Sequence, residues 1–192
     1  MSTPERADEI SAALDRVILM ADERALPAPQ PASQTAAEPL RSCATSGAAG
    51  RTDFDCLDRL AVKNLVDTYA LAYDNYLAEA WFDLFTDDAV FVVGVPGQAP
   101  LEQRGEAFRS FWRERMSAFS NSGNQRRHLM SNIVFLEQTE TAVRASVVGL
   151  LTNTASGRAF SPVATLNYEG WFVKQNGVWK ISRWHDFPDG AV

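Results

Sequence analysis

The stretch VATLNYEGWFVKQNGVWKISRWHDF, residues 163–187, is typical of two antiparallel strands joined by a tight turn. Asn176 and Gly177 stand at its centre, and Asn-Gly is the strongest short hairpin signal because both residues readily adopt the positive φ of a two-residue turn. Two further extended stretches precede it, at 128–137 and 142–154, and turn-forming residues bound each of them. The second half of the chain is therefore predicted to form an antiparallel sheet.

Before these strands, apolar residues recur at helical spacing. Over residues 57–76 they follow one broad face with a period of 3.6, which predicts a core helix of about five turns. A second short helix over 81–85, a turn over 86–88, a strand over 89–95 and a third helix over 105–119 follow. Helices first and antiparallel strands afterwards predict an α+β fold. A curved, mostly antiparallel sheet wrapped around its N-terminal helices would form a cone with a pocket at its open end.

The first 52 residues are predicted to be an extension of the domain that occupies 53–192. Residues 26–51 are rich in Pro, Ala, Ser and Gly and poor in large apolar groups, so they are interpreted as a linker. A short amphipathic helix precedes the linker, since four apolar residues there recur at helical spacing. These residues are Ile10, Leu14, Val17 and Ile18.

Composition argues against several classes of function. The net charge of -6 disfavours a nucleic-acid partner, because binding phosphates requires a basic surface. Cys43 and Cys56 have no metal-ligand spacing with the histidines, and no glycine-rich phosphate loop occurs, so we expect neither a metal nor a nucleotide cofactor. No stretch reaches the ~20 apolar residues of a membrane span, and the N-terminus does not match a signal peptide. A cytoplasmic protein without a membrane partner is the expectation.

One of the two histidines, His128, stands at the start of a predicted strand. Alternation places His128 and Asn132 on the same face of that strand. An imidazole, with a reference pKa of about 6.5, can accept a proton near neutral pH if a carboxylate fixes its tautomer. The structural alternative for His128 is a core histidine that is bonded to a backbone carbonyl.

Five segments together resemble the SnoaL-like members of the nuclear-transport-factor-2-like superfamily, which include scytalone dehydratase and hexachlorocyclohexane dehydrochlorinase. The resemblance covers about residues 53–187 and implies a cone-shaped α+β barrel, which is often trimeric in the dehydratase branch. The segments are LDRLA (57–61), FTDDAVF (85–91), GEAF (105–108), RHLMSNI (127–133) and NGVWKISR (176–183).

The resemblance also implies a pairing of His128 with Asp74, near the end of the first helix, and substrate binding by Tyr73 or Tyr76. Helical arithmetic conflicts with the pairing, because it places Asp74 on the polar arc of the helix together with Asp67. Either the helix bends or ends near Tyr73, which would turn Asp74 inward, or Asp74 is a surface charge.

Other residues are candidates for binding a substrate. Tyr69 and Trp112 could line a cavity for a flat apolar molecule, although core packing is the simpler role for most aromatic residues. His185 shares a face of the final strand with Trp179 and could cap the pocket, whereas Asp186 would point the opposite way.

The leading hypothesis is a cofactor-independent lyase or isomerase, a dehydratase or cyclase acting on a small hydrophobic aromatic or polyketide-like molecule, in a homo-oligomer (trimer or dimer). An alternative is a non-catalytic subunit or ligand-binding protein, such as the small subunit of a ring-hydroxylating dioxygenase. A third possibility is an isomerase or hydrolase that uses carboxylates in place of His128.

Overall fold

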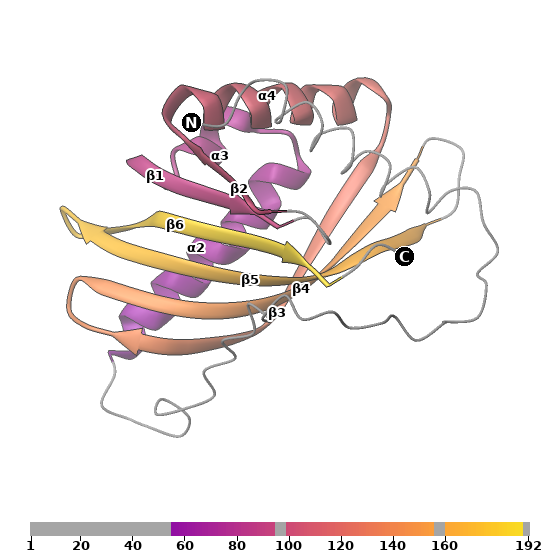
Figure 1. Cartoon of the computed structure of the whole chain (residues 1–192). Coiled ribbons are helices and arrows are strands. Elements are labelled where there is room, and N and C mark those ends of the chain that lie inside the picture. The colour runs from indigo at the N-terminus through magenta and orange to yellow at the C-terminus, as the bar shows by residue number, and fades with distance from the viewer. Residues whose placement is uncertain (1–54, 95–98, 156–159, 190–192) are drawn as a thin grey trace.

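The computed structural model describes residues 55–94, 99–155 and 160–189, so the extension predicted over 1–52 lies outside the described residues. Three helices and six strands are found within the described ranges (Figure 1). In chain order they are α2 (Cys56–Asp74), α3 (Ala78–Phe82), β1 (Phe85–Val93), β2 (Leu101–Arg104), α4 (Gly105–Asn121), β3 (Gln125–Gln138), β4 (Ala142–Thr154), β5 (Ser161–Gln175) and β6 (Val178–Pro188).

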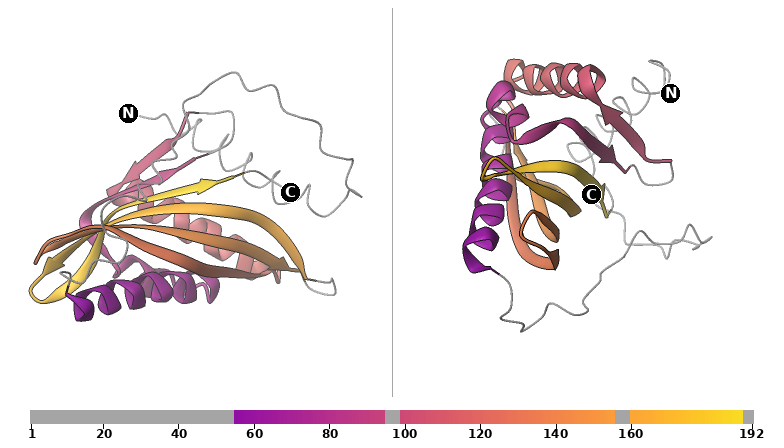
Figure 2. Two further views of the ribbon diagram at one scale, coloured as in Figure 1. Left: turned by 90° about the horizontal axis from the view of Figure 1, so that it is seen from below. Right: turned by 90° about the vertical axis from the view of Figure 1, so that its left-hand side faces the viewer.

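The strands form one curved sheet in the order β2-β1-β6-β5-β4-β3. All neighbours are antiparallel except β1 and β6, which are parallel. β2 and β3 lie at the two edges of the sheet, so the sheet does not close on itself. Helix α2 runs along one face of the curve and α4 lies at one end of it (Figure 2). The predicted α+β class, with a curved sheet around N-terminal helices, is confirmed.

Helix α2 forms because its ends are capped and its apolar stripe is covered. The side chain of Asp55 accepts hydrogen bonds from the backbone N–H groups of Leu57 and Asp58, which satisfies two donors that the first turn leaves open. Val62 and Val66 are fully buried one turn apart and continue into the aromatic core. Among the described residues, no helix is long and apolar enough to cross a membrane.

The first two strands differ from the prediction. The predicted turn over 86–88 belongs to β1, where Asp87 and Asp88 are exposed at an irregularity in the pairing with β6. Their turn-like character therefore reflects a local break inside a strand. β2 was not predicted, because its four residues give too short a pattern; it is defined by antiparallel pairing with β1.

A β-bulge in β3 reverses the alternation of its side chains. The pairing of β3 with β4 is irregular between Ser131 and Val134, and Asn132 has a left-handed φ of 47°. His128 faces inward before the bulge, and Ile133 packs on the core after it, whereas Asn132 is exposed. The prediction that His128 and Asn132 share a face is therefore wrong, since one extra residue shifts the period.

β6 contains a second irregularity of the same kind. Trp171 pairs with Arg183 and Phe172 pairs with Ile181, so Ser182 is left over on β6. Ile181 lies in the core before this point, and Asp186 faces inward after it.

The prediction that His185 shares a face with Trp179 is consequently wrong. His185 lies on the outer face, where the centre of its ring is 4.6 Å from that of Trp171. Its Nε2 accepts a hydrogen bond from Arg183 Nε at 2.7 Å.

Candidate functional site

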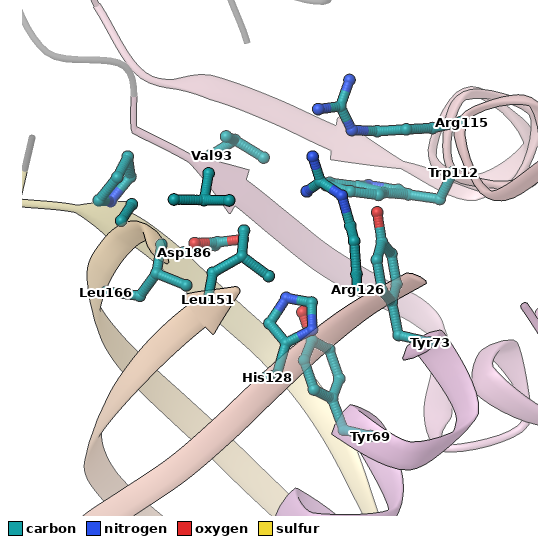
Figure 3. A pocket seen from close by; sticks show the side chains of 13 residues that line it. Tyr69, Tyr73, Val93, Trp112, Arg115, Arg126, His128, Leu151, Leu166 and Asp186 are labelled. Atoms are coloured by element: carbon teal, nitrogen blue, oxygen red, sulfur yellow. The ribbon is translucent and has the colours of Figure 1, made fainter. Parts of the chain in front are cut away.

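A pocket lies between the inner face of the sheet, the end of α2 and helix α4 (Figure 3). The pocket is open to solvent at one side, and its empty space amounts to about 600 Å³ when the solvent at its mouth is included. Aliphatic and aromatic side chains form most of its wall, and a few polar groups converge on it, which is the usual composition of a small-molecule site. The lining residues are Tyr69, Tyr73, Val93, Trp112, Arg115, Arg126, His128, Leu151, Val163, Ala164, Leu166, Asp186 and Pro188.

His128 and Asp74 are in direct contact at one side of this pocket. Asp74 Oδ1 lies 2.6 Å from His128 Nδ1, and Asp74 Oδ2 accepts the backbone N–H of His128 at 2.8 Å. Both side chains are buried. Two bonds to one residue fix the carboxylate in place, and the carboxylate favours the tautomer in which Nδ1 carries the proton.

Tertiary packing explains how Asp74 is buried on the polar arc of its helix. Asp74 is the last residue of α2, and the first half of β3 crosses the helix there. Gln125 of β3 donates to the carbonyl oxygen of Asp74 at 2.8 Å. Asp74 is consequently 2% exposed, whereas Asp67, two turns earlier on the same arc, is partly exposed to solvent and pairs with Lys63. Of the two predicted possibilities, the helix ending near Tyr73 is the observed one.

The second ring nitrogen of His128, Nε2, points toward the pocket and Asp186 (Figure 3). The ring of Tyr73 packs edge-on against the imidazole, with ring centres 5.2 Å apart. Burial raises the pKa of the Tyr73 hydroxyl and raises that of Tyr69 well above its usual value, so both hydroxyls stay protonated and can donate hydrogen bonds.

Asp186 is a site residue that the sequence did not reveal. It reaches the pocket from β6, and its Oδ1 is shielded from solvent without a hydrogen-bond partner among the described residues. Burial raises the pKa of Asp186 from 3.8 to about 6, although His128, Arg115 and Arg126 act to lower it. A carboxyl group with a pKa near neutrality, in contact with a cavity, is suited to proton transfer.

Two arginines also line the pocket and were not predicted. Arg126 precedes His128 by two residues in β3, so alternation alone could have indicated that both face the same side. Arg115 comes from α4, whose periodicity gives no comparable signal because arginine normally lies on a helix surface.

The remaining predicted substrate-binding residues divide into two groups. Tyr69, Tyr73 and Trp112 line the pocket, and Trp112 is held there by a hydrogen bond from its Nε1 to Gln103 at 3.0 Å. Tyr76 lies outside the lining, where its hydroxyl donates to the carbonyl oxygen of Asn124. Asn132 and His185 also lie outside it. Within the described ranges, no group of three or more His, Cys, Asp or Glu side chains could hold a metal ion.

Solved structures share this fold. A protein of unknown function from Mycobacterium tuberculosis is 24% identical, with 70% of this chain and 78% of the other aligned and a TM-score of 0.58. A putative scytalone dehydratase from Novosphingobium aromaticivorans is 19% identical over 71% and 87% of the two chains, with a TM-score of 0.59. The β subunit of a putative aromatic-ring-hydroxylating dioxygenase from the same organism is 18% identical over 69% and 90%, with a TM-score of 0.58. At these identities the likeness establishes the fold alone.

The fold and pocket thus define an α+β protein with an apolar cavity between a curved sheet and its helices. The model of the SnoaL-like domain family matches residues 55–185, and the chain belongs to this family. The resemblance seen in the sequence is confirmed. No curated protein shows significant sequence similarity to the chain.

Proposed function

We propose that the protein is a cofactor-independent lyase or isomerase, of the dehydratase or cyclase type, for a small hydrophobic aromatic or polyketide-like molecule. The observation that carries this proposal is the 2.6 Å contact between His128 Nδ1 and Asp74, with Nε2 directed into an apolar pocket. A histidine with only a packing role is not expected to direct a ring nitrogen into an open cavity.

The reaction uses the two sides of the pocket for opposite proton transfers. In a dehydration, His128 Nε2 takes a proton from the carbon next to an activating carbonyl, and the electron pair left behind forms the new C=C bond. The C–O bond breaks as protonated Asp186 gives its proton to the departing hydroxyl, which leaves as water. Asp74 stabilises the imidazolium that forms. His128 then releases its extra proton to solvent and Asp186 takes up a proton, which restores the starting state of both residues.

The test compares His128→Gln with His185→Gln, a matched control on the outer face. Bicyclic aromatic β-hydroxyketones serve as probes, because loss of water extends their conjugation and changes their absorbance. Deuterium uptake by 2-tetralone reports proton abstraction alone. We expect His128→Gln to lower kcat by a factor of about 10² to 10⁴ while the protein still folds, because a positioned general base usually contributes a rate factor of this size. His185→Gln should remain active.

Two outcomes would favour the other hypotheses. If wild type shows neither dehydration nor exchange and co-purifies with an iron-containing subunit, the protein is a non-catalytic subunit. If His128→Gln stays fully active while Asp186→Asn is inactive, a carboxylate is the base; the unpartnered Oδ1 of Asp186 in the pocket is the observation that favours this second candidate.

A further inference from the structure

Arg126 places a positive charge inside a pocket that is otherwise mostly apolar. The residue is 3% exposed and lines the pocket on the same face of β3 as His128. Its guanidinium carbon lies 3.7 Å from the centre of the Phe119 ring, so the flat group is held against an aromatic face. In Figure 3 its side chain runs beside Tyr73 and carries the guanidinium away from His128. The guanidinium therefore places a positive charge in the wall of the cavity.

Arg115 brings a second guanidinium to the same pocket from α4. It is 8% exposed, and its positive charge, like that of Arg126, acts to lower the pKa of the Tyr73 hydroxyl. Both arginines act to lower the pKa of Asp186, so their electric field reaches the centre of the cavity. Asp186 is a carboxyl group in the same lining, whereas Asp74 lies behind the imidazole of His128.

We infer that the substrate carries a carboxylate, which binds beside Arg126 with Arg115 behind it, while its apolar body lies along Leu151 and Leu166 toward His128. The inference rests on the proposed function, since it takes the same pocket as the substrate site. A guanidinium offers paired donors that match the two oxygens of a carboxylate, and the apolar walls strengthen the attraction. A doubly charged phosphate fits less well, because the carboxyl group of Asp186 faces the same space and would repel it more strongly.

Calorimetric binding of matched ligand pairs tests the inference without any turnover. The probes are 2-naphthoate and 3-phenylpropanoate, each compared with its methyl ester, which keeps the apolar body and removes the charge. We expect both acids to bind wild type at least tenfold more tightly than their esters. Arg126→Gln should remove this preference, and Arg127→Gln should retain it, because Arg127 is the adjacent exposed residue on the opposite face of β3.

Two further variants distinguish a loss of ligand recognition from a loss of folding and from a loss of turnover. If circular dichroism shows that Arg126→Gln does not fold, Arg126→Lys keeps the charge but removes the paired donors, and we expect it to weaken acid binding relative to the ester. His128→Gln should keep the full preference for the acids even where it abolishes turnover. Equal binding of acid and ester to wild type, or failure of both acids to bind at millimolar concentration, would overturn the inference and leave the role of His128 untouched.

Discussion

Asp74 is expected to act as a positioning residue, through the tautomer of His128. In Asp74→Asn, the carboxamide can still accept the backbone N–H of His128 with its oxygen, but its NH₂ group then faces Nδ1. Nδ1 must become an acceptor, so the proton moves to Nε2, which can no longer act as a base. We expect kcat to fall by about 10² to 10⁴ with little change in KM, since the substrate does not touch Asp74.

Nitrogen-15 NMR of the imidazole distinguishes this effect from simple loss of structure. The wild-type ring should carry its proton on Nδ1, and the Asp74→Asn ring should carry it on Nε2. Asp67→Asn is the matched control, because Asp67 lies on the same arc of α2 but its side chain is 41% exposed. An unchanged tautomer together with unchanged kcat in Asp74→Asn would remove Asp74 from the mechanism.

Helix α2 carries Asp74 at one end and its N-cap at the other, so the two ends can be tested separately. Asp55→Ala removes the acceptor for the N–H groups of Leu57 and Asp58, at 2.8 and 2.9 Å. We expect the free energy of unfolding to fall by about 1 kcal/mol, the usual value of an N-cap. Urea denaturation measures this loss. Asp55→Asn keeps an acceptor and should be nearly neutral; equal losses in both variants would contradict a capping role.

The helices and strands show what could be predicted from local pattern and what could not. The period of α2 and the Asn176-Gly177 turn gave the right elements because their signals lie within one segment. The residues that share a face in β3 and in β6 were predicted wrongly across Asn132 and Ser182, because each irregularity adds one residue that a strict two-residue period cannot register. Because of the irregularity in β6, Asp186 faces the pocket in place of the predicted His185.

The rest of the site could not be predicted from local pattern, because it is assembled from segments that are far apart in the sequence. Asp74 and His128 are 54 residues apart, and their pairing could be expected from the family resemblance but not from helix periodicity. Asp186 and Arg115 join them only because β6 lies at the centre of the sheet and α4 closes one end. The homo-oligomer, a trimer or dimer, stays a prediction that light scattering can check.

The free energy of unfolding of the whole molecule should depend on pH through Asp186. Its pKa is raised from 3.8 to about 6, so the folded protein holds a proton that the unfolded chain has already released between these values. Stability therefore falls as pH rises from about 4 to about 6, and remains lower above that. Because one pKa unit corresponds to about 1.4 kcal/mol, the loss for this group is at most about 3 kcal/mol.

Asp186→Asn removes that dependence, since an amide does not ionise. We expect the variant to be more stable than wild type at pH 7 to 8 and similar near pH 4, as measured by urea denaturation at each pH. Asp189→Asn, an exposed carboxyl group three residues further on, is the control and should not reproduce the pattern. A difference between Asp186→Asn and wild type that does not vary with pH would contradict the raised pKa. A variant that gains stability at neutral pH while losing turnover would indicate that the fold tolerates a buried ionisable carboxyl group because the reaction requires it.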